Sequence, residues 1–295
     1  MGPTATGKSG LAMELARCLP APPVEIVSAD AMQVYRVMDV GTAKPSAKDQ
    51  AEVPHHLIDV VEPHQDFSVA HFQAAAREAL ADIEARGDRA LVVGGTGLYV
   101  RALVDDLDLP GQWPDVRDDI ESEADTAVLH ERLHRVDPVA AGRMTPANRR
   151  RVVRALEVTL GSGRPFSSFG PGLTEHPGTR YRMAGVWLPR PVVGQRIQQR
   201  FDAMLGVGLV DEVRRLAARP AGLSRTAGQA LGYREMLDHL AGRCSLEQAV
   251  EEAVRRTRAF ARRQRMWFRR DPRITWYGAA EDPVTLLSAL LGDWS

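Results

Sequence analysis

Eight residues at the start of the chain have the types and spacing of a phosphate-binding loop. The pattern G-x-x-x-x-G-K-[ST] is fitted by Gly2, Pro3, Thr4, Ala5, Thr6, Gly7, Lys8 and Ser9. In such a loop, backbone N–H groups and the N-terminus of the following helix surround an anion, and the lysine adds a point charge. A serine hydroxyl at this position can ligate Mg²⁺, so we expect Ser9 to hold Mg²⁺ as the cofactor. The pattern indicates a diphosphate or triphosphate without naming the ligand.

An aspartate that follows a predicted strand is the clearest candidate for acid–base chemistry. Residues 24–28 form a short apolar strand, and Asp30 comes directly after it. Open α/β sheets bind ligands at the carboxyl ends of their strands, so we expect Asp30 to face the same site as the loop. There it can act as a general base, cap a helix, or hold a water molecule of Mg²⁺. The residues alone leave these roles open.

A second glycine-rich segment follows another apolar strand. Residues 90–93 lead into Gly94-Gly95-Thr96-Gly97, where many nucleotide hydrolases have an aspartate for Mg²⁺ instead. The hydroxyls of Thr96 and Thr4 can hydrogen-bond either a phosphate or a base, or can serve a turn. Because Asp30 still follows a strand, a P-loop small-molecule kinase stays among the alternatives.

The elements that must position these residues alternate between strands and helices. We predict helices at 9–19 and 68–86 and strands at 24–28, 57–61 and 89–93, which is typical of an α/β fold with a parallel sheet flanked by helices, similar to P-loop NTPases. Residues 112–159 are helical and charged without a strand signal, so we expect an all-helical insertion domain. Strands are then expected at 183–188 and 274–277, and helices at 191–204, 210–217, 228–240 and 245–269. The predicted division is a core of 1–111, an insertion of 112–182, and a second core part of 183–295.

The strand that normally leads into such a loop has no place in this sequence, because the loop begins at residue 2. A P-loop joins a buried strand to a helix, and a missing central strand leaves backbone groups unpaired. Either the coding start is assigned too late or the natural chain lacks this strand. We favour a late start, with six to ten mostly apolar residues upstream.

Arginines recur at spacings of three and four along the predicted helix 245–269. One stripe is formed by Arg255, Arg258, Arg262, Arg265 and Arg269. No acid lies between Glu252 and Asp271 to pair with them, so RNA phosphates are the favoured partner, although a solvated helix face is the alternative. A second patch lies in the predicted insertion, at Arg149, Arg150, Arg151 and Arg154.

Composition excludes some classes of protein. The net charge is zero, 26% of residues are charged, and no run of 18 apolar residues could span a membrane. The start lacks the apolar stretch of a signal peptide, so we expect a cytoplasmic protein, and we expect a monomer. The adjacent His55 and His56 would face opposite sides of a strand and make a poor metal-chelating pair, so structural or RNA-backbone roles are favoured.

Several longer segments resemble bacterial tRNA dimethylallyltransferases, also called tRNA isopentenyltransferases, of the IPP transferase family. The segments are Asp30-Ala31-Met32-Gln33-Val34-Tyr35, 38–45 (MDVGTAKP), 53–59 (VPHHLID), 94–99 (GGTGLY), 231–235 (LGYRE) and 258–268 (RAFARRQRMWF). The likeness runs from the first residue to about Trp276. Ala31 stands where the family often has Ser, Arg262 where it often has Lys, and Gln229 where some members have Arg.

The resemblance implies transfer of a dimethylallyl group from dimethylallyl diphosphate to N6 of the adenosine just 3′ of the anticodon. It implies that Asp30 is the base, with Thr4, Lys8 and Thr96 as the other catalytic residues, and that residues 2–9 bind the diphosphate. The implied contacts with the anticodon stem-loop of tRNA come from Asp30, Ala31, Met32, Gln33, Thr96, Arg117, Arg150, Arg151, Arg154, Gln229, Gly232, Tyr233, Arg234, Arg258 and Arg262. The alternatives are an adenylate prenyltransferase of the cytokinin type, a P-loop small-molecule kinase, and a noncatalytic RNA-binding protein with a relic loop.

Overall fold

A computed structural model describes residues 1–170, 172–173 and 175–294, and the chain forms two compact units. Unit 1 comprises Met1–Val104 and Thr179–Ser295, and unit 2 comprises Asp105–Gly178. The predicted insertion, 112–182, overlaps unit 2, which starts and ends earlier in the chain. In the described part of the chain, no helix is both long and apolar enough to cross a membrane.

Unit 1 contains two sets of parallel strands. The first is a sheet in the order β2-β1-β3, and the second is the pair β4-β5. All six residues of β1 are buried, as expected for the central strand of a parallel sheet with both faces covered. The parallel pairing agrees with the predicted α/β fold. The strands are β1 (Val24–Ala29), β2 (His55–His56), β3 (Arg89–Gly94), β4 (Ala184–Trp187) and β5 (Thr275–Gly278).

The strand predicted at 57–61 is wrong. The strand at this place is β2, which ends at His56, and beyond it only Val61 forms an isolated bridge, to Tyr35. Leu57 and Asp59 have φ angles of 62° and 55°. These left-handed conformations turn the chain out of the extended form, which an apolar pattern by itself does not reveal.

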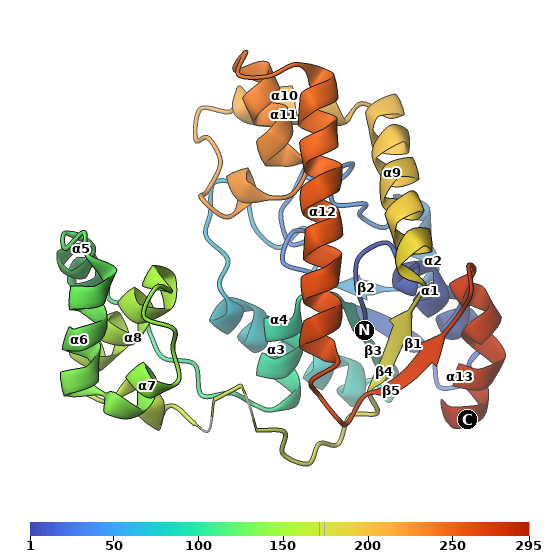
Figure 1. Ribbon diagram of the computed structural model, residues 1–295. Helices are drawn as coiled ribbons and strands as arrows, with labels where there is room; N and C mark the ends of the chain where they lie inside the picture. The colour runs from blue at the N-terminus through green and yellow to red at the C-terminus, as the bar shows by residue number, and fades with distance from the viewer. Residues whose placement is uncertain (171, 174, 295) are drawn as a thin grey trace. The chain divides into compact units, whose positions relative to one another are not determined.

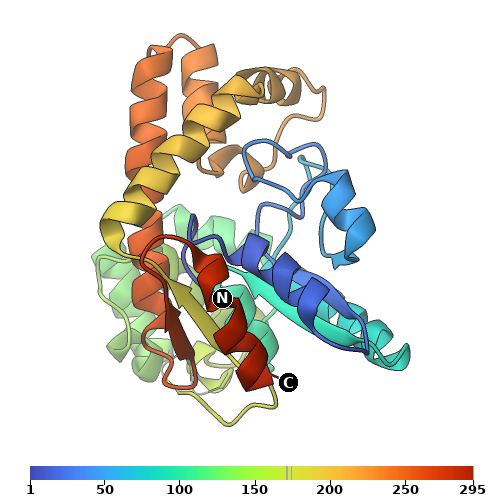
Figure 2. The same cartoon turned by 90° about the vertical axis from the view of Figure 1, so that its right-hand side faces the viewer.

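Helices surround the strands of unit 1 (Figure 1). Two of them begin where the sequence predicts, because Ser68 and Ser245 each accept a hydrogen bond from the third residue of the helix and form capping boxes. Figure 2 shows the long α12 and α9, which pack against each other. The helices are α1 (Lys8–Cys18), α2 (Ala47–Glu52), α3 (Val69–Ala85), α4 (Gly97–Val104), α9 (Arg190–Gly206), α10 (Leu209–Ala217), α11 (Tyr233–Leu240), α12 (Leu246–Phe268) and α13 (Leu287–Trp294), with 3₁₀ turns at Ala227–Gln229 and Pro283–Leu286.

Unit 2 is a small helical bundle with its own apolar core. Its helices are α5 (Pro114–Glu121), α6 (Thr126–Val136), α7 (Pro138–Gly142) and α8 (Arg149–Ser162), followed by a 3₁₀ turn at Phe166–Ser168. Ile120, Leu133 and Leu156 are each fully buried, so α5, α6 and α8 share one core. The helical character predicted for this segment is present.

A cavity of about 450 Å³ lies between β3 and β4 in unit 1. Its lining includes Leu91 and Val93 of β3, Val186 of β4 and Leu11 of α1. Among the described strands, none pairs with β3 on the side away from β1, or with β4 on the side away from β5. The space therefore has the position and the apolar lining of a missing parallel strand.

Met1 lies at the end of this space, and its backbone pairs with β4. Its amine donates to the Ala184 carbonyl oxygen at 2.7 Å, and the Val186 amide donates to the Met1 carbonyl oxygen at 2.9 Å. These two bonds are those of a parallel ladder. Burial, with a smaller contribution from Lys8, lowers the pKa of the Met1 amine to about 5. A peptide N–H at this position would make the same bond without burying an ionisable group.

An extension of six to ten apolar residues ahead of Met1 should raise the melting temperature by about 5 °C or more, because it would pair with both open strand edges and fill the cavity. The loop of residues 2–9 would then be anchored at both ends. The matched control is an extension of equal length made of Gly, Ser and Pro, which cannot form the ladder. Equal melting temperatures for the two extended forms and the 295-residue chain would refute this interpretation of the cavity.

Candidate active site

The loop of residues 2–9 folds back on itself just before α1. Ala5 and Gly7 have φ angles of 61° and 75°, and the Thr6 hydroxyl donates to the Pro3 carbonyl oxygen at 2.9 Å. Gly7 precedes the first residue of α1, so the unpaired N–H groups of that helix open toward the loop. An anion held there would meet several N–H groups and the positive end of the helix dipole.

Lys8 and Ser9 follow directly in the first turn of α1. The Lys8 amine donates to the Pro3 carbonyl oxygen at 3.3 Å and therefore folds back over the loop. Burial lowers the pKa of Lys8 to about 8, while the charge of Asp30 raises this pKa and that of Arg200 lowers it. Ser9 is exposed. In the described part of the chain, no group of three or more His, Cys, Asp or Glu side chains can hold a metal ion, so Mg²⁺ would depend on the Ser9 hydroxyl and on the oxygens of a bound diphosphate.

Arg200, on α9, is a functional candidate that the sequence did not reveal. Its Nη1 donates to the Thr4 hydroxyl at 3.3 Å. Burial lowers the pKa of Arg200, and Asp30 and Tyr233 raise it. A second cation therefore faces the loop together with Lys8. The sequence offers no signal for this role, because Arg200 is one of several arginines in a polar helix and only the packing turns it toward Thr4.

Asp30 lies at the end of β1 and uses one carboxylate oxygen to cap its own turn. Its Oδ1 accepts from the amides of Met32 and Gln33 at 2.8 and 3.4 Å. Its Oδ2 has no hydrogen-bond partner among the described residues. The next amide, that of Ala31, donates to the Thr96 hydroxyl at 3.1 Å. The turn-capping role is thus present, and one oxygen stays available to accept a proton.

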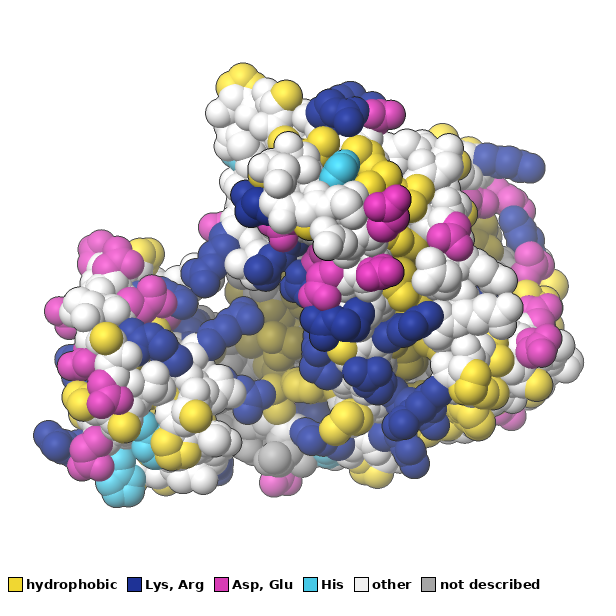
Figure 3. Space-filling view, turned by 45° about the horizontal axis from the view of Figure 1, so that its top comes forward, with side chains coloured by type: hydrophobic (Ala, Val, Ile, Leu, Met, Phe, Trp, Pro, Cys, Tyr) yellow, Lys and Arg dark blue, Asp and Glu magenta, His cyan; other side chains and the backbone are white. Residues whose placement is uncertain are grey.

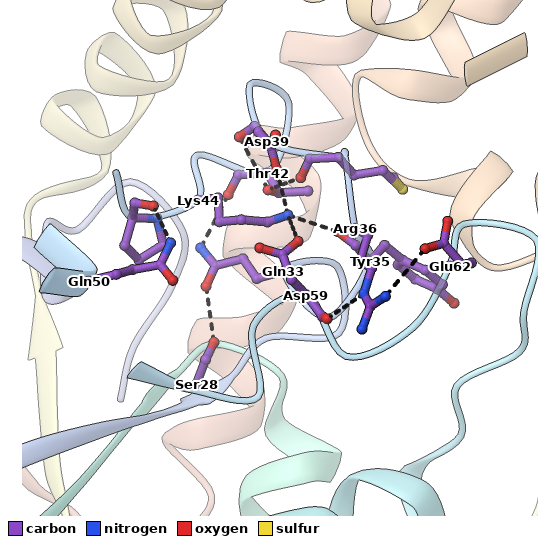
Figure 4. Close-up of polar contacts among 12 residues, drawn as sticks. Ser28, Gln33, Tyr35, Arg36, Asp39, Thr42, Lys44, Gln50, Asp59 and Glu62 are labelled. Carbon is purple, nitrogen blue, oxygen red and sulfur yellow. Dashed lines mark hydrogen bonds and ion pairs between the residues drawn. The ribbon is translucent and has the colours of Figure 1, made fainter. Parts of the chain in front are cut away.

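The loop that follows Asp30 is held by a polar network around Lys44 (Figure 4). The Lys44 side chain is only 4% exposed, and its amine lies 2.6 Å from Oδ1 of Asp39 and 2.6 Å from Oδ1 of Asp59. The Gln33 amide accepts from the Ser28 hydroxyl at 3.0 Å and donates to the carbonyl oxygens of Thr42 and Ala43. Gln33, predicted to contact tRNA, is therefore engaged at both ends of its amide within the chain.

A buried carboxylate supports the same loop from α10. Glu212 is 4% exposed and accepts from the amides of Asp39, Val40 and Gly41 at 3.0, 2.9 and 3.3 Å. The Tyr233 hydroxyl donates to Glu212 at 2.6 Å. A Cβ at Gly41 would lie 2.4 Å from the Tyr233 ring, so only glycine allows this approach. Tyr233 and Gly232 are buried, and they support the loop from the interior of unit 1.

Basic side chains gather where α9 and α12 run in unit 1, as Figure 3 shows. Arg258 and Arg262 on α12 and Arg269 at its C-cap are exposed, and Arg258 also donates to the Gly194 carbonyl oxygen at 3.2 Å. Arg255 instead pairs with Glu252, so it takes part in an ion pair within the helix. Arg265 is half-buried and stacks over the Trp187 ring, with 5.4 Å from its guanidinium carbon to the ring centroid. Four members of the predicted stripe are thus exposed, Arg255 and Arg258 among them with partners within the chain, and Arg265 is half-buried. Two other predicted tRNA contacts, Gln229 and Arg234, are also exposed.

The arginines of unit 2 are divided in the same way. Arg117 and Arg154 pair with the buried Glu157 at 3.5 and 2.8 Å, and Arg154 also donates to the carbonyl oxygens of Pro110 and Gly111. These two arginines, predicted to contact tRNA, neutralise a carboxylate whose side chain is 2% exposed. Arg150 and Arg151 are exposed and form no ion pair within the described residues, so they are the members that can meet a phosphate.

The adjacent histidines have ordinary partners. His56 lies 2.6 Å from Oε2 of the buried Glu25, which also pairs with Arg86, and the His55 ring lies 2.7 Å from the Val53 carbonyl oxygen. Burial opposes the charge of Glu25, but the hydrogen bonds from Arg86 and His56 lower its pKa overall. These contacts agree with the structural role favoured over metal binding.

Comparisons with known proteins identify the family of this chain. The family model described as IPP transferase matches residues 33–271. A tRNA dimethylallyltransferase of a Nocardioides species is 45% identical over 299 residues, with 99% of this chain and 95% of that protein covered. The tRNA isopentenylpyrophosphate transferase of Bacillus halodurans has a TM-score of 0.72 and 37% identity, with 99% of this chain and 93% of that chain covered.

A further solved structure, of a eukaryotic dimethylallyltransferase acting on tRNA, has a TM-score of 0.81 and 25% identity, with 99% of this chain and 77% of that chain covered. With a family model that spans most of the sequence and relatives similar over nearly all of it, the chain belongs to the IPP transferase family.

Proposed function

We propose that this protein transfers a dimethylallyl group from dimethylallyl diphosphate to N6 of the adenosine just 3′ of the anticodon in tRNA, and releases diphosphate. The observation that carries the proposal is the meeting of Lys8, Arg200 and the amides of the loop with the free oxygen of Asp30 at one edge of the sheet. Two cations suit a leaving diphosphate, and a carboxylate suits the proton of an attacking amine.

In the proposed reaction, the bond between the prenyl carbon and the diphosphate oxygen breaks while N6 of the adenine bonds to that carbon. Both electrons of the broken bond leave with the diphosphate. The Lys8 amine, the Arg200 guanidinium and the N–H groups at the start of α1 stabilise this charge. Oδ2 of Asp30 takes the proton from N6, while Oδ1 stays bonded to the turn. Mg²⁺, when bound through Ser9 and the phosphate oxygens, supplies further charge neutralisation.

The tRNA is proposed to be held by phosphate contacts with exposed arginines. In unit 1 these are Arg258 and Arg262, and in unit 2 they are Arg150 and Arg151. A base in the anticodon loop can be turned out of its stack into a pocket, whereas a base within an RNA helix cannot. Thr96, whose hydroxyl faces the turn at Asp30, is proposed to position the adenine. Because tRNA is the substrate, we place the enzyme in the cytoplasm, and we propose that it acts as a monomer.

One assay distinguishes this function from its alternatives. Unmodified tRNA, labelled dimethylallyl diphosphate and Mg²⁺ are incubated with the protein, and AMP and ATP are added as competing acceptors. Label in tRNA supports the proposal. Label in AMP or ATP indicates an adenylate prenyltransferase, ATP consumption without label transfer indicates a kinase, and tRNA binding without diphosphate release indicates a noncatalytic protein.

Lys8→Ala should lower the transfer rate by ~10²-fold or more and weaken diphosphate binding, because it removes a cation from the leaving group. The affinity for tRNA should stay nearly unchanged, since the exposed arginines lie on other elements. Lys48→Ala, which removes an exposed lysine from α2, is the matched control. An equal loss of diphosphate and tRNA affinity in Lys8→Ala would contradict this separation of tasks.

Asp30→Asn should lower the single-turnover rate by ~10²-fold or more at saturating substrates, because it removes the proton acceptor. The asparagine carbonyl oxygen can still accept from the amides of Met32 and Gln33, so the melting temperature and both substrate affinities should change little. A near-normal single-turnover rate would leave Asp30 with its turn-capping role alone.

Replacing Arg258 and Arg262 together by Ala should weaken tRNA binding and reduce the slope of log affinity against log salt by about one to two units, since each phosphate contact releases about one counterion. Arg255→Ala should have a smaller effect, because Arg255 is already paired with Glu252 on the same helix. Titrations at several salt concentrations measure both. An unchanged slope in the double variant would show that these side chains do not contact the RNA backbone.

A further inference from the structure

Gln264 lies on the buried face of α12 and has both ends of its amide engaged. The residue is 7% exposed. Its Oε1 accepts from the backbone amide of Thr4 at 2.8 Å, and its Nε2 donates to the carbonyl oxygen of Gly95 at 2.8 Å. One side chain thus cross-links the phosphate-binding loop to the second glycine-rich loop, 94–97, although the three segments are far apart in sequence.

Each of these two bonds ends beside a group that the proposed reaction uses. The Thr4 backbone amide donates to Gln264, and the Thr4 hydroxyl accepts a hydrogen bond from Arg200. Gly95 is followed by Thr96, whose hydroxyl accepts from the amide next to Asp30. Gln264 therefore links two parts of the proposed site. One is Thr4 with Arg200, where the diphosphate would leave, and the other is Thr96, next to the proton acceptor Asp30.

The fit around Gln264 leaves little freedom. A Cβ at Gly95 would lie 2.5 Å from Nε2 of Gln264 and 3.1 Å from the Gly2 carbonyl oxygen, so the amide rests directly on the backbone of both loops. Trp267, three residues further along α12, packs against Gly97 in the same way. The bond to Thr4 also fixes the direction of one loop amide, and with it the orientation of its neighbours.

We propose that Gln264 is a positioning residue, which fixes the loop of residues 2–9 relative to the loop of residues 94–97. The diphosphate would then leave from the prenyl carbon while Asp30 accepts the proton of the amine that attacks the same carbon. This inference rests on the proposed function. A shift of one ångström between reacting groups can cost ~10²-fold in rate, so losing the cross-link should lower kcat far more than it changes substrate binding.

The sharpest test is Gln264→Glu in the full chain, assayed for prenyl transfer to unmodified tRNA. The glutamate has the same size and keeps an oxygen for the Thr4 amide, but it places an acceptor against the Gly95 carbonyl oxygen. We expect kcat to fall about 10- to 100-fold, while KM for dimethylallyl diphosphate and the dissociation constant for tRNA change less than about threefold. Gln264→Ala, which removes both bonds, should fall at least as far.

Thr257→Val is the matched control. Thr257 lies two turns earlier on the buried face of α12, is 9% exposed, and its hydroxyl has no hydrogen-bond partner among the described residues. This change keeps the shape of the side chain and removes a buried hydroxyl that has no partner, without touching either loop, so kcat should stay within about twofold of the wild type.

Three results would overturn the inference. One is an unchanged kcat in Gln264→Glu, and another is a fall in kcat that follows only the loss of folded protein, as measured by melting temperature and circular dichroism. The third is an equal fall in Thr257→Val, which would indicate a general effect of α12 packing. If the wild-type protein transfers the prenyl group, any of these three results overturns the role of Gln264 and leaves the proposed function intact. If the wild-type protein transfers no prenyl group, the proposed function and the role of Gln264 are both overturned.

Discussion

Charge on a departing diphosphate has to be met by cations that are already in place, and cations held close together repel one another. Lys8 and Arg200 show this conflict directly, because burial lowers the pKa of both and the charge of Arg200 lowers the pKa of Lys8 further. Asp30 acts in the opposite direction on both groups. Three parts of the chain must therefore meet at one point: the start of α1, the end of β1 and the turn of α9 that carries Arg200.

Loops alone cannot hold such an arrangement. Buried polar side chains on the interior side of these loops bind their backbone groups and fix them in place. Gln264 binds the loops that begin at Gly2 and Gly94, while Glu212 and Lys44 hold the segment that follows Asp30. Each of these groups has its hydrogen bonds satisfied by backbone amides, carbonyls or opposite charges, so its burial costs little. The helices α10 and α12 consequently contribute to the site through their inner faces, and α12 also presents exposed arginines on its outer face.

The same division between inner and outer faces explains which arginines are free to meet RNA. Arg117 and Arg154 neutralise Glu157 in the interior of unit 2, and breaking such a buried pair destabilises a fold strongly. Arg150 and Arg151 extend from the same helix α8 into solvent. An arginine-rich segment thus combines residues that are paired within the fold with residues that are exposed to solvent.

The sequence by itself determined the phosphate-binding loop, the parallel α/β architecture, the helical insertion and the place of Asp30 after β1, because these depend on local spacing and on the period of apolar residues. It did not determine the course of 57–61, where left-handed residues end the strand, or the roles of Arg200 and Gln264. Those roles arise from contacts between segments up to 260 residues apart, for which a single sequence carries no local signal. Only the tertiary structure revealed an apolar cavity between β3 and β4 with Met1 paired at its end. The reason is physical: hydrogen-bonding edges and buried volume exist only after the strands have come together.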